Sequence, residues 1–348
     1  MLLDVSGTGG NDIWAVGQYE VRPHVPRYPL AAHWDGTAWR KVDVPIPPGK
    51  NNVSLNAVAA IAPDDAWAVG SAGTTGDLQE TTLITHWDGA SWQIVPSPNV
   101  GDTNTPNQLS AVAAAGPDDV WAVGYAAENT FRPIAQHWDG HAWTIVPLPA
   151  PETGHGVLSG VAVRASDDAW AVGYARSSTA RSTTEPYVVH WDGHSWTRVQ
   201  TPNSDASGTR LTDVAIAPSG QAYAVGATLW TTWEGGTTGK AAVMRYDGAH
   251  WDFVNVPSFN TEGTRVSDVT IAPDGDVWLT GSNVAGDSYA RLSAGTWELV
   301  RGADVPSWSG PAEEALTMVA GRIWMVGRYY PSSNSYAQTY AERSPVLY

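Results

Sequence analysis

The feature that most constrains this chain is a tryptophan-rich unit of about fifty residues that recurs along its whole length. A segment of the form Asp-Asp-Ala-Trp-Ala-Val-Gly returns every 46 to 55 residues, and a second segment, His-Trp-Asp-Gly-x-x-Trp, closes the first six units with some variation. The aromatic residue of the first segment is Trp14, Trp67, Trp121, Trp170, Tyr223, Trp278 or Trp324, and the last residue of the second is Trp39, Trp92, Trp143, Trp196, Trp251 or Trp297. Residues 337–348 align without a gap with residues 135–146, so a seventh, degenerate copy fills the C-terminal end. Such a period is typical of repeat architectures.

Each repeat predicts four short β-strands. In repeat 2, the small apolar residues 55–62 predict a strand buried on both faces, and residues 66–69 alternate small and large side chains. Residues 83–87 and 92–95 predict two more strands, joined by an Asp-Gly hairpin turn. No segment has a sustained period of 3.6 residues, so no helix is expected.

Four-stranded repeats of this length predict an all-β chain, a seven-bladed β-propeller with four-stranded antiparallel blades. We expect one domain spanning residues 1–348. Its blades are predicted at about 1–52, 53–104, 105–156, 157–209, 210–264, 265–311 and 312–348. Sixteen of the 19 tryptophans occupy repeat positions, where large aromatic side chains are expected to fill the space between neighbouring blades.

The repeat resembles those of the kelch-like propellers, including the central domain of galactose oxidase. The resemblance rests on the run from Trp67 to Gly70, the Trp87-Asp88-Gly89 turn, Trp92 and Pro96. Kelch repeats usually have two adjacent glycines after the second strand, whereas this chain has Val-Gly. The copper chemistry of galactose oxidase depends on a cysteine-tyrosine crosslink, and this chain has no cysteine.

Closure of the predicted ring admits two arrangements. Repeat 1 begins at its innermost strand and repeat 7 ends near its outermost strand. Either side-chain packing of blade 7 on blade 1 closes the ring, or the natural protein has a further strand upstream of Met1.

Composition narrows the classes of partner. A formal net charge of −16 repels phosphate backbones and anionic lipid, so neither nucleic acid nor membrane insertion is expected. The absence of cysteine excludes disulfides and thiolate metal sites. We expect no cofactor, and a monomer or a part of a larger chain or complex. An extracellular or cell-surface location is expected, with the signal sequence absent from this chain.

The longest and most variable connections are predicted at one end of the propeller, the top face. Variable loops on a rigid scaffold are where binding sites usually lie. Two groups of side chains there have no packing role in the repeat. The first is Trp230, Trp233 and Trp308, and the second is Tyr19, Arg22, His24, Arg27, Tyr28, Arg328, Tyr329 and Tyr330. Together they predict a ligand-binding arc, although each group can instead cover its own loop or balance local charge.

Other polar residues that resemble functional sites are expected to have structural roles, because most of them recur at one position of the repeat. His33, His86, His137 and His190 occupy one repeat position, so they are expected on a wide circle and not around one metal. The aspartates of the Asp-Gly turns are expected to cap those turns. Residues 235–240 resemble a phosphate loop but lack its first glycine and its final Ser or Thr.

Three carboxylates share one position on the innermost strands: Asp4, Asp213 and Asp268. They could gather at the channel and hold a Ca²⁺ or Mg²⁺ ion, or they could bind water and backbone there.

These observations favour a non-catalytic recognition module that binds a glycan or a protein through the top face. An alternative is a propeller enzyme of the glycoside hydrolase or polysaccharide lyase type, with Asp213 and Asp268 at the ~5–9 Å separation that paired carboxylates need. A structural spacer within a longer secreted protein is a third hypothesis.

Overall fold

The computed structural model describes residues 1–20, 26–76, 79–177, 183–202, 208–231, 237–259, 261–283, 286–300, 312–329 and 338–344. The described chain is β-strand and turn, apart from the three-residue 3₁₀ helix η1 (Pro257–Phe259). No helix in these residues is long and apolar enough to cross a membrane.

The strands follow the repeats in order. Repeats 1 and 2 contain β1 (Leu2–Gly9), β2 (Asp12–Glu20), β3 (Arg27–Trp34), β4 (Trp39–Val42), β5 (Asn52–Ala62), β6 (Asp65–Gly73), β7 (Thr81–Trp87) and β8 (Trp92–Ile94). Repeats 3 and 4 contain β9 (Asn107–Gly116), β10 (Asp119–Ala127), β11 (Phe131–Trp138), β12 (Trp143–Ile145), β13 (Gly156–Ala165), β14 (Asp168–Arg176), β15 (Thr184–Trp191) and β16 (Trp196–Arg198). Repeats 5 to 7 contain β17 (Gly208–Ile216), β18 (Ala222–Thr231), β19 (Thr237–Tyr246), β20 (Trp251–Phe253), β21 (Arg265–Ile271), β22 (Val277–Asn283), β23 (Gly286–Ser293), β24 (Thr296–Val300), β25 (Ala312–Val319), β26 (Arg322–Tyr329) and β27 (Gln338–Arg343).

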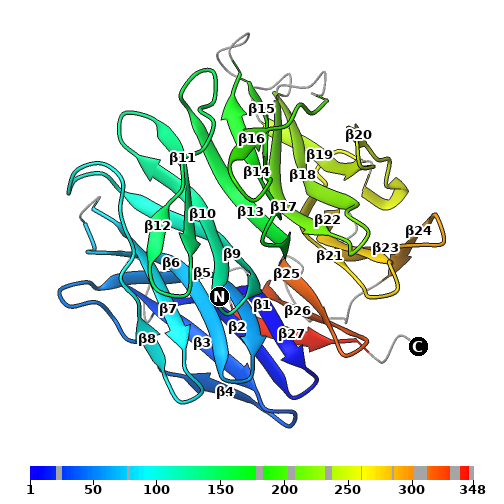
Figure 1. Cartoon of the computed structure of the whole chain (residues 1–348). Coiled ribbons are helices and arrows are strands. Elements are labelled where there is room, and N and C mark those ends of the chain that lie inside the picture. The colour runs from blue at the N-terminus through cyan, green and yellow to red at the C-terminus, as the bar shows by residue number, and fades with distance from the viewer. Residues whose placement is uncertain are drawn as a thin grey trace.

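The hydrogen-bonded strands form six sheets among the described residues. Four sheets contain one four-stranded repeat each, and the strands of repeat 7 form a three-stranded sheet. The largest sheet has eight strands because a single parallel pairing, Thr184 with Gly208, joins the antiparallel strands of repeats 4 and 5. The all-β expectation with four-stranded antiparallel units is confirmed. Figure 1 shows these units arranged around an axis, with the first strand of each unit toward the middle.

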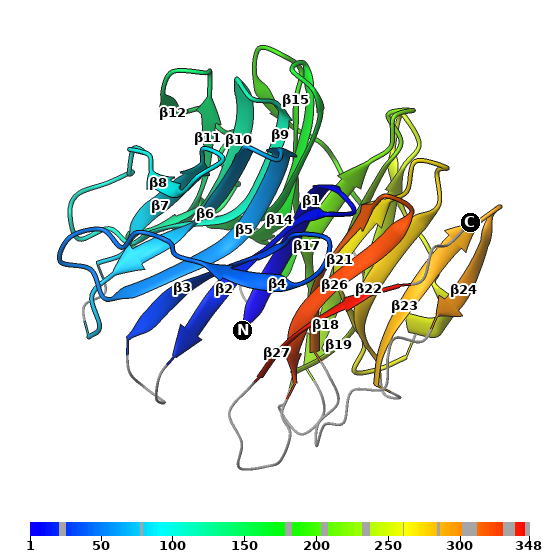
Figure 2. The same ribbon diagram turned by 90° about the horizontal axis from the view of Figure 1, so that it is seen from below.

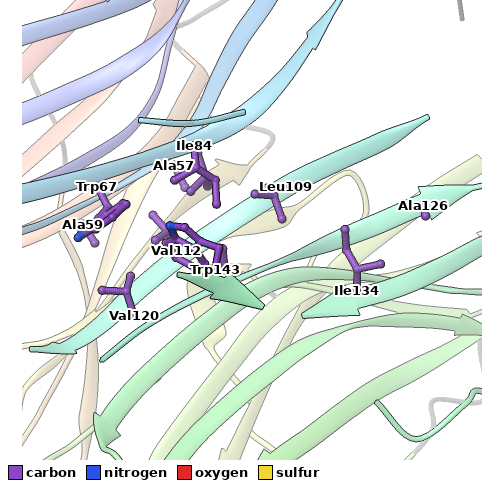
Figure 3. Packing of buried hydrophobic residues seen from close by; sticks show 12 residues of the cluster. Ala57, Ala59, Trp67, Ile84, Leu109, Val112, Val120, Ala126, Ile134 and Trp143 are labelled. Carbon is purple, nitrogen blue, oxygen red and sulfur yellow. The ribbon is translucent and has the colours of Figure 1, made fainter. Parts of the chain in front are cut away.

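Tryptophan side chains form the contacts between neighbouring repeats, as the repeat spacing predicts. Trp67 on β6 lies with its ring centroid 4.9 Å from that of Trp138 and 5.3 Å from that of Trp143, both in repeat 3. Figure 3 shows Trp67 and Trp143 of this junction among aliphatic side chains. The equivalent pairs are Trp14 with Trp87 and Trp92, Trp121 with Trp191 and Trp196, and Trp170 with Tyr246 and Trp251.

Repeat 7 meets repeat 1 through the same kind of contact. Trp324 on β26 lies 5.5 Å from Trp34 and 6.0 Å from Trp39, centroid to centroid. Leu2 and Val5 pack in one buried cluster with Trp324. Figure 2 shows β1 beside β25 and β26. Among the described strands, none of repeat 1 pairs with β25, β26 or β27, so the contacts described between these two repeats are made by side chains.

The glycine that ends the recurring segment of the second strand has a steric cause. Every innermost strand has a β-bulge at the same place, where the register with the second strand shifts by one residue. The bulge brings a backbone carbonyl against the glycine of the second strand. A Cβ atom on Gly70 would lie 2.1 Å from the carbonyl oxygen of Ser54, and Gly17, Gly124, Gly173, Gly226 and Gly281 have the same close contact. Only glycine fits at this position.

Replacing Gly70 with alanine is therefore expected to lower the free energy of unfolding by at least about 2–3 kcal/mol, because the bulge must move to admit the methyl group. Urea unfolding measures the change. Gly116→Ala is the matched control, since a Cβ there meets nothing within 4 Å. Equal stability of the two variants would contradict the steric explanation.

Candidate functional site

Strand direction divides the connections between two ends of the molecule. The top face is the end at which each first strand begins and each second strand ends, as where Leu2 pairs with Gly17. The opposite end, the bottom face, has short turns such as residues 10–11, 63–64 and 166–167. Described top-face connections include the longer segments 95–106 and 146–155.

The predicted binding arc is described only in part. Tyr19 and Tyr28 stack with ring centroids 5.5 Å apart, and the Lys41 ammonium lies 4.6 Å from the centroid of Tyr19. Arg27 donates hydrogen bonds to the side chains of Asn52 and Gln18. These three predicted residues therefore contact their own neighbours in repeats 1 and 2.

The rest of the arc stays a prediction. Trp230 lies in β18, and Arg328 and Tyr329 lie in β26, but their side chains are outside the described part of the chain. Arg22, His24, Trp233, Trp308 and Tyr330 lie outside the described residues altogether, as do residues 235 and 236 of the segment 235–240.

The three predicted carboxylates line a central channel of about 510 Å³, together with small residues such as Ala57 and Ala111. Each one accepts a hydrogen bond from a backbone N–H of the next repeat. The partners are Val58 for Asp4 (2.7 Å), Val269 for Asp213 (3.1 Å) and Leu316 for Asp268 (2.8 Å). Asp4 and Asp268 also accept from the N–H of the residue that follows them, Val5 and Val269, so the described hydrogen bonds of all three carboxylates come from backbone donors, in line with the structural alternative.

Burial in the channel wall controls the charge of these carboxylates. Burial raises the pKa of Asp4 to about 7. It also raises the pKa of Asp213 and, with the nearby charge of Asp213, the pKa of Asp268. Asp213 and Asp268 lie near enough to influence each other, and the pKa of both is raised. No three His, Asp or Glu of the described chain are grouped to hold a metal ion.

The repeated histidines stay apart, as expected. Each pairs with an aspartate of its own repeat and stacks on the second-strand tryptophan. His33 lies 2.7 Å from a carboxylate oxygen of Asp12, with its ring centroid 4.5 Å from that of Trp14. His86, His137 and His190 repeat this arrangement with Asp65, Asp119 and Asp168.

The Asp-Gly turns are capped as expected. A carboxylate oxygen of the turn aspartate accepts hydrogen bonds from the backbone N–H groups two and three residues further along the chain, which lowers its pKa. The residues are Asp35, Asp88, Asp139, Asp192 and Asp247. At Asp35 the side chains of Thr37 and Arg40 lower the pKa more than these N–H groups do.

An aromatic cluster that the sequence did not predict lies on the top face of repeats 3 to 5. The exposed ring of Phe131 lies 5.1 Å from that of Tyr125 and 5.3 Å from that of His155. Nδ1 of His155 lies 2.8 Å from the hydroxyl of Thr130. The phenol of Tyr125 donates to Gln108 at 2.6 Å.

Two arginines adjoin these rings. The guanidinium of Arg210 lies 4.6 Å from the ring centroid of Tyr174. Burial lowers the pKa of His155, and the charges of Arg176 and Arg210 lower it further. Neither arginine forms an ion pair with another described residue. We call Tyr125, Phe131, His155, Tyr174, Arg176 and Arg210 the upper-rim cluster.

Comparison with known proteins shows the fold alone. No family model and no curated protein matches this chain. Among solved structures, "YCF48 bound to D1 peptide" aligns with a TM-score of 0.58 and 16% identity over 94% of this chain and 88% of that one. The β-propeller domain of the Trilobed protease from Pyrococcus furiosus, described as having an open velcro topology, aligns with a TM-score of 0.56 and 10% identity over 99% and 96%. A lectin from Aleuria aurantia in complex with Fucα1-6GlcNAc aligns at 0.50 and 12% identity over 86% and 94%. This chain has a β-propeller fold.

Proposed function

We propose that this protein is a non-catalytic recognition module that binds a segment of another polypeptide across the upper-rim cluster. The observation that supports this most is that Arg176 and Arg210 lie in the same cluster as the exposed ring of Phe131. Neither arginine has an ion-pair partner among the described residues. Aromatic and arginine side chains are the residues that most often dominate the energy of protein interfaces.

Charge indicates the chemistry of the partner. On a chain with a net charge of −16, Arg176 and Arg210 make a local positive site beside apolar rings. A carboxylate forms charge-assisted hydrogen bonds with guanidinium groups, and an adjacent apolar side chain can cover Phe131. The preferred ligand is therefore a segment with an acidic residue next to an apolar one.

The width of the cluster favours an extended ligand. Its residues come from β10 and β11 of repeat 3, from β14 and the connection before β13 in repeat 4, and from β17 of repeat 5. Propellers of similar fold bind a peptide in one case and a fucosylated sugar in another. The glycan alternative rests on Trp230, Trp233 and Trp308.

Peptides selected by the full chain from a displayed random library are expected to be enriched in an acidic residue beside an apolar one. Arg210→Ala and Phe131→Ala should each weaken binding of those peptides by about tenfold or more, which is the loss of a typical interface hot spot. Calorimetric titration measures the change.

The matched controls are Arg40→Ala and Ile145→Ala, which remove an exposed arginine and an exposed apolar side chain elsewhere. Equal losses in the controls would contradict the proposal. Binding to a glycan array that disappears in a Trp230→Ala/Trp233→Ala double variant would support the glycan alternative instead.

A further inference from the structure

A second pocket, of about 540 Å³, lies on the bottom face between repeats 4 and 5. Its wall on the repeat 4 side contains Arg164, Asp167, Asp168, Trp170 and His190. Its wall on the repeat 5 side contains Ser219, Gly220, Gln221, Tyr246, Asp247 and Gly248. We call it the 4–5 pocket. Its volume is within the range of small-molecule sites.

One substitution in the repeat explains why this pocket is open. In repeats 1, 2 and 4 a tryptophan of the third strand reaches the first turn of its own repeat, where its indole N–H donates to a carbonyl oxygen. The pairs are Trp34 with Gly10 (3.2 Å), Trp87 with Pro63 (3.1 Å) and Trp191 with Ser166 (3.0 Å).

Repeat 5 has the smaller Tyr246 at this position. Its hydroxyl donates to Gly248 of the neighbouring hairpin turn at 3.0 Å and does not reach the first turn. The space between the turn at 217–221 and the turn at 247–250 is therefore left open.

The lining combines an aromatic wall with polar groups of both kinds. The ring of Tyr246 lies 4.7 Å from that of Trp170, which His190 covers at 4.5 Å. Asp168 is already bonded to His190 and Arg164. The side chains of Asp167 and Gln221 have no hydrogen-bond partner among the described residues, so they are available to a ligand.

We infer that the 4–5 pocket binds a neutral sugar residue. A sugar ring presents hydroxyl groups that both donate and accept, and the pocket offers the carboxylate of Asp167, the amide of Gln221 and the guanidinium of Arg164. The face of a sugar can lie against the ring of Tyr246. An anion is disfavoured because three carboxylates outnumber one arginine in the lining. Asp168 and Asp247 already have hydrogen-bond partners within the chain, so only Asp167 is left to attract a cation. This site is on the face opposite the upper-rim cluster and is independent of it.

Saturation-transfer difference NMR with a panel of neutral methyl glycosides tests the inference. At least one glycoside is expected to receive saturation from the wild-type chain. Tyr246→Trp restores the residue of repeats 1 to 4 and fills the pocket, so the variant should fold with unchanged or higher thermal stability. The signal should then fall by about tenfold or more, because the ligand is excluded sterically.

A matched pair of variants locates the site. Asp167→Ala should weaken the signal severalfold. Asp64→Ala changes the equivalent exposed residue of repeat 2, beside which Trp138 of repeat 3 packs on Trp67, and should leave the signal unchanged. Arg210→Ala on the top face should also leave it unchanged. Failure of every glycoside to receive saturation, or full binding by Tyr246→Trp, would overturn the inference.

Discussion

Replacing Trp324 with alanine is expected to lower the free energy of unfolding by about 3–5 kcal/mol, the usual cost of deleting a fully buried tryptophan. The side chain is 2% exposed and fills the junction of repeats 7 and 1 against Trp34 and Trp39. Because no described strand of repeat 1 pairs with repeat 7, the loss also removes much of what joins them. Chemical denaturation measures the global cost.

Trp67→Ala is the matched control, since Trp67 occupies the same repeat position and is also 2% exposed. It should cost about as much in global stability. The two variants should differ in amide hydrogen exchange: Trp324→Ala should accelerate exchange in β1 and β26, whereas Trp67→Ala should accelerate it in β6 and β9. Unchanged exchange in β1 of Trp324→Ala would show that other contacts hold the junction.

The features that repeat along the chain were predictable, because the residues responsible for each of them occur at the same position in several repeats. The tryptophan contacts between units, the separated histidines and the capped Asp-Gly turns all follow from one position seen in several copies. The bulge that requires the repeated glycine was not predicted, since a one-residue shift in strand register leaves no mark in the alternation of side chains.

The upper-rim cluster was not predicted because its members come from three repeats and become neighbours only when the blades pack. A signal was present: Tyr125 and Tyr174 follow the repeat glycine, where repeats 2 and 5 have Ser71 and Ala227. The 4–5 pocket was missed for a related reason. Tyr246 is a conservative change in sequence, and its effect depends on whether the side chain reaches a turn of its own repeat.

The position shared by Asp4, Asp213 and Asp268 was identified, and its backbone partners explain its use. A carboxylate there accepts the N–H of the next innermost strand, which links adjacent repeats. The remaining repeats have Ala57, Ala111, Gly160 and Ala315 at the equivalent place. The link therefore occurs at some junctions only. Its cost is the burial of a carboxyl group in the channel wall, which disfavours the charged form of that group.

That cost predicts a dependence of stability on pH. The pKa of Asp4 is raised from 3.8 to about 7, so between these values the folded chain retains a proton that the unfolded chain releases. Stability is then expected to fall as pH rises from about 4 to about 7, by roughly 2–4 kcal/mol for this one group, and to change little from it above pH 7. Asp213 and Asp268 act in the same direction because burial raises the pKa of both.

Asp4→Asn separates this contribution from the rest. Its amide oxygen can still accept one of the two N–H groups of Val5 and Val58, and it does not titrate. The loss of stability between pH 5 and pH 8, measured by urea unfolding, should be smaller in the variant than in the wild type. The difference between the two proteins is the relevant quantity, because the lowered pKa of His155 makes stability rise over part of the same range. An identical pH profile in both proteins would mean that Asp4 is charged in the folded state at neutral pH.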